Sequence, residues 1–500
     1  MRTIALERSK ERKKRNEEMN WALENAAQAV GAQPPAEMYL AARIAGVSID
    51  SRTVKPGELF FAIRGPRFDG HDFVRAALGE GAVAAVVERE RLGQFAPELR
   101  GRLLGVADTL AALGGLARAM RREWCSLGDR RMAAITGSSG KTTTKEILAA
   151  LVAERMPVLR SEGNLNNAYG LPLTLCRLEE THRAAVVELG MSHRGELADL
   201  TRLAEPEVGV VTNVAPAHLA FFASVDEIAL AKRELIENLA GDDTVAVLNA
   251  DDPRVSRFGE AAPGRVITFG VSETTDFRAD AIEDRGVDGS AFDFLWRGGR
   301  ARLLLPLVGA HNVKNALAAL AAASVWGVGA EEARAAFPRL RPSGHRGRLL
   351  RFREGFALLD DCYNSNPAAL AAVIGWLAGV RGFERRVLVA GEMLELGPSS
   401  AALHREAGRW AAGRVDWIFG VQGDAEEIVC GAIEAGHPAA RTQFFPNADQ
   451  AAAFLPNWLR PNDLAVVKGS RGVRMERIVE AIAQGREPAE AAPSAARGRC

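Results

Sequence analysis

Long hydrophobic runs, paired cysteines and an excess of charge of either sign are all missing from this sequence of 500 residues. No apolar run approaches the roughly 18 to 20 residues that a membrane-spanning helix needs, so we expect no membrane insertion. The five cysteines lie far apart with no CxxC pair, which argues against a disulfide framework and for a reducing compartment. Lys plus Arg equals Asp plus Glu at 63 each, so no overall field favours a nucleic acid or a membrane surface. Anionic ligands must therefore be held locally.

The two ends of the chain differ from the rest in composition. Residues 1–20 interleave basic and acidic side chains and are not followed by an apolar segment, so they do not form a secretory signal, and we expect a frayed helical extension. Residues 486–500 are rich in Ala, Pro, Glu and Arg without an apolar period, and we expect a disordered tail. We expect the protein to be cytoplasmic.

Between these ends, β-branched apolar runs alternate with Ala- and Leu-rich helical stretches, a pattern typical of parallel sheets covered by helices. The fold class is therefore α/β, and the length predicts about three domains. We expect a small N-terminal α/β domain at 21–128, a central phosphate-loop domain with a parallel sheet at 129–340, and a Rossmann-like domain at 341–485. RPSGHRGR (341–348) reads as the second boundary because Pro and Gly interrupt helix on both sides.

Polar residues end three of the buried strands expected in the central domain. AAVVELG (184–190) contains Glu188, VGVVTNV (208–214) contains Asn213, and VAVLNA (245–250) contains Asn249. Because ligands bind at the carboxyl ends of parallel strands, we expect the chemistry to gather there.

The sharpest motif is TGSSGKTTTKE (136–146), a Gly-rich turn between an expected strand and an expected helix. Such a turn can hold phosphates with backbone N–H groups, with Lys141 reaching the β/γ phosphates and Thr142 a Mg²⁺ ion. The standard pattern has a further Gly where Ile135 stands, so the loop is a shortened variant. A connecting turn with a chance lysine is the alternative, and the loop alone does not separate motors, kinases, switches and ligases.

Three more residues supply groups that an ATP-dependent reaction needs. Glu188 is a hard oxygen ligand suited to Mg²⁺. His218 in NVAPAHL could bind a second metal or a phosphate, and Lys232 follows in ALAKREL. Taken singly, a histidine such as His218 is more often a hydrogen-bonded loop residue than a ligand, and a lysine such as Lys232 is in most cases a surface residue of a helix.

Together these stretches resemble the Mur ligases of peptidoglycan synthesis, and within them the ligases that add D-alanyl-D-alanine to UDP-N-acetylmuramoyl-tripeptide. The resemblance runs from about residue 46 to 480. Its motifs are SIDSRTVKPGELFFAIRG, DGHDFV, TGSSGKTTTKE, EGNLNNAYGLPLT, VELGMSHRGEL, NVAPAHL, GAHNVKNALAA, DDCYNSNPAAL, GEMLELGPSSAALHREAG and VVKGSRGVRMERIV.

The resemblance implies a role for each matching residue. The ATP-binding residues would be Gly137, Ser138, Ser139, Gly140, Lys141, Thr142, Thr143, Asn312, Asn315, Arg346 and Asp361, with the two asparagines at the adenine. The catalytic group would be Lys141, Glu188, His218 and Lys232. Thr142 and Glu188 would hold one Mg²⁺ ion, His218 would serve a second, and Lys232 would be carbamylated. Ser51, Arg52, Asn164, Asn166 and Asn167 would contact the UDP-linked substrate.

The implied reaction is ATP-dependent amide ligation through an acyl phosphate, with UDP-MurNAc-tripeptide and D-Ala-D-Ala as substrates, no nucleic acid, and a monomeric enzyme. Closure of the domains would keep water from the acyl phosphate. One departure is Ala220, Phe221, Phe222 and Ala223, where the family has an acidic residue and a Gly-Phe-Gly stretch, which puts the local loop shape in doubt.

Three alternatives stay open at this point: a ligase that adds the third residue, a folylpolyglutamate synthase-like ligase, and a non-catalytic ATP-binding scaffold. YNSNP (363–367) and the first-domain motifs DSR and DGHDF favour the D-Ala-D-Ala ligase over the first two.

Overall fold

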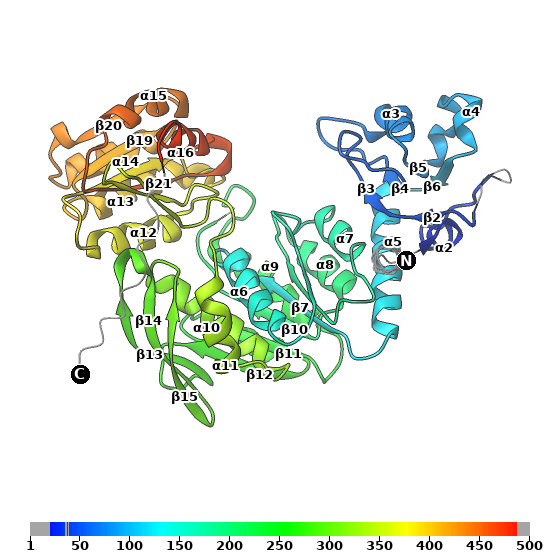
Figure 1. Ribbon diagram of the computed structural model, residues 1–500, viewed down its shortest axis with the longest axis horizontal. Helices are drawn as coiled ribbons and strands as arrows, with labels where there is room; N and C mark the ends of the chain where they lie inside the picture. Colours follow the sequence, from blue (N-terminus) through cyan, green and yellow to red (C-terminus); the bar gives the residue numbers. More distant parts are fainter. Residues whose placement is uncertain (1–20, 36–37, 39, 218, 488–500) are drawn as a thin grey trace, which may run out of the picture.

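The computed structural model describes residues 21–35, 38, 40–217 and 219–487. The extension at 1–20 and residues 488–500 of the expected tail lie outside the described residues. The α/β fold class is confirmed, with parallel strands in each of three larger sheets. Figure 1 shows three units in a row, with the central one (cyan to yellow-green) between the N-terminal unit (blue) and the C-terminal unit (yellow to red). The exact domain boundaries stay predictions.

The N-terminal unit is built on a parallel sheet of four strands in the order β3-β4-β5-β6. Its strands are β3 (Gly46–Ser48), β4 (Glu58–Phe61), β5 (Ala84–Glu88) and β6 (Leu103–Val106), with α3 (Val74–Gly79) packed on them. A two-stranded ribbon of β1 (Trp21–Ala22) and β2 (Arg43–Ile44) lies beside α2 (Leu23–Ala29). The long helix α5 (Thr109–Ser126) begins at Asp108, whose carboxylate accepts from two backbone N–H groups, and leads into the central unit.

The central unit contains a sheet of nine strands in the order β15-β14-β13-β12-β11-β10-β7-β9-β8. The parallel strands are β7 (Arg131–Thr136), β8 (Val158–Arg160), β9 (Ala184–Glu188), β10 (Val208–Val211), β11 (Val245–Asn249), β12 (Arg265–Gly270) and β13 (Phe277–Asp284). The strands expected at 131–137, 184–190, 208–214 and 245–250 are confirmed as β7, β9, β10 and β11.

An antiparallel extension that the sequence analysis did not anticipate completes this sheet. β14 (Ser290–Trp296) and β15 (Gly299–Leu305) continue antiparallel from β13. Along β15, Ala301, Leu303 and Leu305 are buried while Arg300, Arg302 and Leu304 are exposed, which is the alternation of a sheet with one wet face. The central sheet is therefore mixed rather than wholly parallel.

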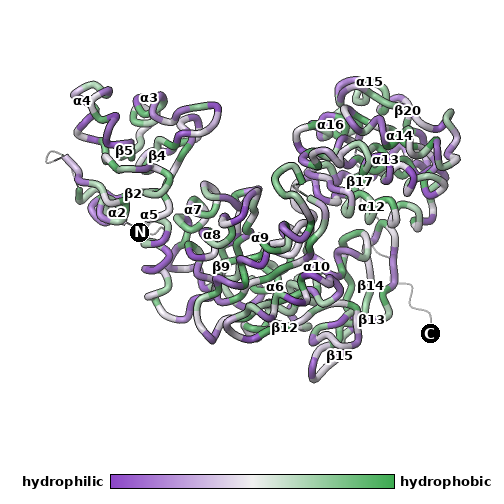
Figure 2. Tube along the Cα trace, turned by 180° about the vertical axis from the view of Figure 1, so that it is seen from behind, coloured by the Kyte–Doolittle hydropathy of each residue, from purple (hydrophilic) through white to green (hydrophobic). Residues whose placement is uncertain are grey.

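Helices cover both faces of the parallel part of this sheet. α6 (Lys141–Ala153), α10 (Ala310–Ser324) and α11 (Ala330–Ala336) pack on one face, and α10 is buried without a break from Ala316 to Ala323. Figure 2 colours much of the centre of this unit as hydrophobic. α7 (Gly170–Leu175), α8 (Glu196–Ala204), α9 (Val225–Glu237) and α5 pack on the other. Burial on both faces explains why the strands read as unbroken apolar runs and leaves their carboxyl ends as the place for polar side chains.

The C-terminal unit has a six-stranded sheet in the order β16-β17-β21-β18-β19-β20, parallel except for β16. Its strands are β16 (Arg348–Arg351), β17 (Ala357–Asp360), β18 (Arg385–Gly391), β19 (Trp417–Val421), β20 (Thr442–Phe445) and β21 (Asp463–Lys468). α12 (Pro367–Gly379), α13 (Ser400–Ala411) and α14 (Ala425–Glu434) cover one face, and α15 (Ala448–Trp458) and α16 (Glu476–Ala483) cover the other. No helix among the described residues is both long and apolar enough to cross a membrane.

Candidate active site

A cavity of about 1040 Å³ lies at the carboxyl ends of the central strands, and residues of the C-terminal unit form its other side. Most of the residues that the sequence predicts for a site line it: Ser138, Ser139, Gly140, Lys141, Thr142, Thr143, Asn164, Asn166, Asn167, Glu188, Lys232, Asn312, Asn315, Arg346 and Asp361. The structure therefore gathers side chains from two units, far apart in sequence, around one space.

The turn between β7 and α6 needs glycine at two positions. Gly140 caps α6 with a φ of 80°, in the left-handed region, and a Cβ there would collide with the side-chain amide of Asn315. Gly137 has a φ of 148°, and a Cβ there would strike the Thr212 hydroxyl. The glycines thus let the backbone pass close to its neighbours, and α6 directs its first N–H groups at the cavity.

Asn213, at the end of β10, holds this phosphate loop (residues 137–140) in place. Its Oδ1 accepts from the Ser139 N–H at 3.0 Å, and its Nδ2 donates to the Ser139 carbonyl at 3.1 Å. The Ser138 N–H is also occupied, by the Asn213 carbonyl at 2.9 Å. The N–H groups of Ser138 and Ser139 are thus bound within the protein, which leaves the N–H groups at the start of α6 as the backbone donors that face the cavity. Sequence reasoning placed Asn213 at the strand end but missed this role.

Lys141 bends back over the loop. Its Nζ donates to the Gly137 carbonyl at 2.7 Å. Burial lowers the pKa of Lys141; the Glu188 carboxylate opposes this shift, and the charge of Arg346 adds to it. A cation held inside the loop, with one carbonyl as its hydrogen-bond partner among the described residues, is suited to contact an anionic phosphate.

Thr142 and Glu188 place two oxygens side by side. The Thr142 hydroxyl donates to Glu188 Oε2 at 2.6 Å, and Asn166 Nδ2 donates to Glu188 Oε1 at 2.9 Å. Thr142 and Glu188 are each 3% exposed. A buried carboxylate beside a hydroxyl is a donor set that Mg²⁺ prefers. Asn166, expected at the UDP-linked substrate, here orients this carboxylate.

Lys232 is a buried lysine that has no counter-ion among the residues that the structure describes. It lies in α9, is 2% exposed, and makes no hydrogen bond or ion pair with any described residue. Two other lysines are equally buried, but Lys145 pairs with Glu146 at 3.0 Å and Lys468 pairs with Asp361 at 2.7 Å. Burial, with a smaller contribution from the charge of Lys141, lowers the pKa of Lys232 well below its ordinary value.

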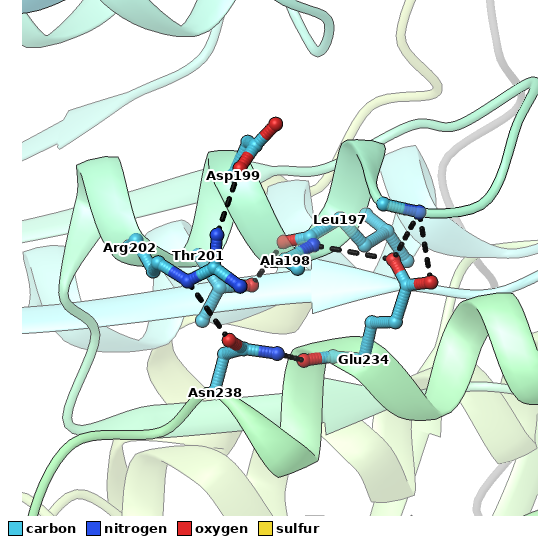
Figure 3. A network of polar contacts seen from close by, with 8 residues as sticks. Leu197, Ala198, Asp199, Thr201, Arg202, Glu234 and Asn238 are labelled. Carbon is cyan, nitrogen blue, oxygen red and sulfur yellow. Dashed lines mark hydrogen bonds and ion pairs between the residues drawn. The ribbon is translucent and has the colours of Figure 1, made fainter.

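A network of polar contacts fixes α9 against α8 (Figure 3). The Glu234 carboxylate accepts from the Gly195 N–H at 2.8 and 3.0 Å and from the Ala198 N–H at 3.3 Å, and so caps the start of α8. Asn238, directly after the end of α9, accepts from Arg202 of α8 at 3.1 Å. These contacts fix the position of the helix that carries Lys232 relative to the loop that follows Glu188.

Asn312 and Asn315 lie on the first turns of α10, and both are nearly buried. Asn312 Nδ2 donates to the Val308 carbonyl at 2.8 Å, and Asn315 Nδ2 donates to Asn312 Oδ1 at 2.9 Å. Asn315 also packs against Gly140. Asn312 therefore orients Asn315, Asn315 contacts the phosphate loop at Gly140, and both side chains line the cavity.

The C-terminal unit contributes a cluster of charges to the cavity. Arg346 lies over the Tyr363 ring at 3.9 Å, and Arg471 donates to the Tyr363 hydroxyl at 3.1 Å. Lys468 pairs with Asp361 and also donates to the Asn364 carbonyl at 3.1 Å. The motifs that contain Tyr363, Lys468 and Arg471 are visible in the sequence, but sequence reasoning gave these three residues no role.

The loop with the unusual sequence Ala220–Ala223 contacts the C-terminal unit. The Ala220 N–H donates to the Glu395 carbonyl at 2.9 Å, and Phe221 lies 5.3 Å from the His193 ring. Phe222 is buried at 6% exposure. The loop thus joins two units through its backbone, a contact that does not depend on the side chain at Ala220.

Three predicted residues lie elsewhere, and one cannot be placed. Gly137 does not line the cavity itself, and Ser51 and Arg52 lie in the N-terminal unit. Arg52 is largely exposed and pairs with Asp50 at 2.6 Å. His218 lies outside the described residues.

Comparison with known families matches three successive parts of the chain. The Mur ligase family, catalytic domain, matches residues 43–121; the Mur ligase middle domain matches 135–323; and the Mur ligase, glutamate ligase domain, matches 345–471.

Curated relatives and solved structures agree with these matches. UDP-N-acetylmuramoyl-tripeptide--D-alanyl-D-alanine ligase from Haemophilus influenzae is 35% identical over 445 residues, covering 87% of this chain and 93% of the relative. A crystal structure of MurF from Acinetobacter baumannii superposes with a TM-score of 0.82 at 31% identity, covering 93% of this chain and 98% of the other. MurF ligase from Thermotoga maritima in complex with ADP gives a TM-score of 0.74 at 28% identity, covering 87% and 96%.

Proposed function

The chain belongs to the Mur ligase family, and from this premise we propose that it joins D-alanyl-D-alanine to UDP-N-acetylmuramoyl-tripeptide with consumption of ATP. The observation that carries the proposal is that six residues line one cavity: Lys141, Thr142, Glu188 and Lys232 from the central unit, and Arg346 and Asp361 from the C-terminal unit. Among these, Lys232 has no partner within the described part of the chain. This combination serves a ligase better than a scaffold, because a scaffold has no use for a costly unpaired buried lysine.

The ATP phosphates are proposed to lie at the start of α6, with Lys141 beside them. Support comes from the positive end of the helix, the free N–H groups of its first turn and the second cation, Arg346, on the facing unit. On the central side, Asn312 and Asn315 are proposed to face the adenine, and on the C-terminal side Asp361 is proposed to face the ribose. Both sides must be in place for ATP to be held, so domain closure would complete the site.

Mg²⁺ fits the donor set of Thr142 and Glu188, and His218 is proposed for a second ion. The bound ions would neutralise charge on the phosphates. The contribution of the chain is to hold Glu188 in place: Asn166 and Thr142 each donate to one carboxylate oxygen, and the Ser161 hydroxyl accepts from the backbone N–H of Glu188 at 3.1 Å.

Lys232 is proposed to react with CO₂. The nitrogen of its neutral amine would form the bond to carbon while one proton leaves to solvent, so that a neutral amine becomes a carbamate anion. The low pKa favours this step because only the neutral amine is a nucleophile, and the absence of a described counter-ion leaves the nitrogen unblocked. An anion at this place would also balance Lys141 and the bound cations.

The ligation has two steps in which the protein acts by positioning and charge. A carboxylate oxygen at the end of the tripeptide attacks the γ-phosphorus, ADP leaves, and an acyl phosphate forms. The amino nitrogen of D-alanyl-D-alanine then attacks the acyl carbon and loses a proton, and phosphate leaves as the amide forms. Lys141 and the N–H groups of α6 are aimed at the charge that develops on the transferred phosphoryl group.

The remaining contacts are assigned by unit. Asn164, Asn166 and Asn167 are proposed to line the path of the UDP-linked peptide, with Ser51 and Arg52 at its UDP end. The C-terminal unit is proposed to receive the dipeptide. A monomer is proposed because one chain supplies the whole cavity, and the cytoplasm is proposed because Cys125, Cys176, Cys362 and Cys430 are all free thiols.

Substrate dependence tests this function. Purified protein with Mg²⁺ and ATP should release phosphate only when UDP-MurNAc-tripeptide and D-alanyl-D-alanine are both present. The matched control replaces the dipeptide with D-alanine at the same concentration. Equal turnover with the single amino acid would point to another ligase of the family, and turnover with neither acceptor would point to a simple ATPase.

A further inference from the structure

Three side chains of different ligand chemistry meet where the C-terminal unit begins. His345 precedes β16, Asp360 ends β17, and Cys362 follows two residues later. Asp360 Oδ2 lies 2.8 Å from His345 Nδ1, and the Cys362 thiol donates to Asp360 Oδ1 at 3.1 Å. One ligand atom from each residue lies within 4.8 Å of the others. One nitrogen, one oxygen and one sulfur atom that can each bind a metal ion therefore lie close together in this structure.

We propose that His345, Asp360 and Cys362 form a binding site for Zn²⁺, distinct from the proposed magnesium site at Thr142 and Glu188. Thiolate and imidazole ligands favour zinc, whereas Mg²⁺ prefers oxygen ligands alone. Zinc bond lengths of about 2.0 to 2.3 Å at tetrahedral angles separate such ligand atoms by about 3.3 to 3.6 Å. His345 and Cys362 contact different oxygens of Asp360, at 2.8 and 3.1 Å, and one ligand atom from each of the three residues lies within 4.8 Å of the others, so the tetrahedral separations need shifts of roughly 1 Å.

Charge and burial also suit a divalent ion here. Asp360 is 0% exposed and Cys362 is 1% exposed. Zinc would displace the thiol proton to solvent, and the resulting thiolate and carboxylate carry two negative charges that the ion cancels. The His345 side chain is 37% exposed, so the ion can enter from that side and a water can take the fourth position.

The site lies behind the wall of the active-site cavity. Arg346, Asp361 and Tyr363 line the cavity. Their neighbours in sequence, His345, Asp360 and Cys362, do not line it, because successive residues of an extended chain face opposite sides. The Gly347 N–H donates to the Asp360 carbonyl at 2.9 Å. A metal here would link the segment that enters the C-terminal unit to the end of β17, and so fix the corner that presents Arg346 and Asp361.

Cobalt substitution on the full chain tests the site. Millimolar Mg²⁺ is kept in excess to occupy the oxygen ligands, and Co²⁺ is added as the probe. One equivalent should bind with a thiolate-to-cobalt charge-transfer band, which Cys362→Ser should abolish. The matched control is Cys430→Ser, which removes a half-buried thiol in α14 and should keep the band.

Equilibrium dialysis with Zn²⁺ provides the second readout. The wild type should retain one ion per chain. His345→Ala, which removes a partly exposed ring and leaves the core intact, should weaken binding by about tenfold or more. No band in the wild type, an equal band in Cys362→Ser, or unchanged zinc affinity in His345→Ala would each overturn the proposal. None of these readouts depends on ligase activity, so a failure of the zinc proposal can be distinguished from a failure of the proposed ligase function.

Discussion

Replacing Asn213 with alanine should disable the phosphate loop without unfolding the protein. The substitution removes the acceptor for the Ser139 N–H at 3.0 Å, the acceptor for the Ser139 hydroxyl at 3.2 Å and the donor to the Ser139 carbonyl at 3.1 Å. A net hydrogen bond contributes about 0.5 to 1.5 kcal/mol, and water in the cavity can replace part of the loss, so we expect a cost of about 1 to 3 kcal/mol. If this cost falls on the bound loop conformation, kcat/KM for ATP should fall roughly 5- to 150-fold.

Steady-state phosphate release at saturating levels of the other two substrates measures this effect. The matched control is Asn447→Ala, because Asn447 caps α15 with a 3.0 Å hydrogen bond to the Gln450 N–H, away from the cavity. Loss of that cap costs about 1 kcal/mol of stability but should leave kcat/KM unchanged. Wild-type kinetics in Asn213→Ala, or an equal loss in both variants, would refute the reasoning.

Three further changes test other parts of the site. Lys232→Ala should lose most activity and recover part of it with added short carboxylates, while Lys55→Ala should behave as wild type; full activity without rescue would exclude a carbamate role. Gly140→Ala should weaken ATP binding at least about tenfold because its Cβ meets Asn315, whereas Gly298→Ala, also at positive φ but in open space, should cost only about 1 kcal/mol of stability. Because the lowered pKa of Lys232 makes unfolding take up a proton, stability should rise with pH from the folded-state pKa toward about 10.4. In CO₂-free buffer, Lys232→Met should therefore raise Tm more at about pH 7 than at about pH 9.5; a constant difference would contradict a charged-state penalty.

The sequence indicated the parts of the fold that follow from burial on both faces. β7, β9, β10 and β11 are unbroken apolar runs, and parallel strands of that kind are recognisable without tertiary information. The antiparallel β14 and β15 were missed for different reasons. β15 has one solvent-exposed face and mixes arginine with leucine, whereas β14 is fully or partly buried along its length but carries Asp293 in its middle. The identity of both strands depends on pairing partners that only the folded sheet supplies.

Some residues of the candidate site could likewise be predicted from the sequence, and others could not. Glu188 and Lys141 were identified because their residue types and positions carry the chemistry. Asn213 and Lys468 act on other protein groups, Ser139 and Asp361, and such pairings depend on which loops meet in space. The sequence likewise did not show that Lys145 pairs with Glu146 while Lys232 has no partner among the described residues, because both are lysines in helices.

Transfer of labelled oxygen tests the central claim most directly. UDP-MurNAc-tripeptide with ¹⁸O in both oxygens of its terminal carboxylate is incubated with the enzyme, Mg²⁺, ATP and D-alanyl-D-alanine, and the products are analysed by mass spectrometry. Attack of the carboxylate on the γ-phosphorus predicts one ¹⁸O atom in each released phosphate and one in the new amide. Unlabelled phosphate, or labelled tripeptide that returns without amide product, would contradict carboxylate activation by this protein.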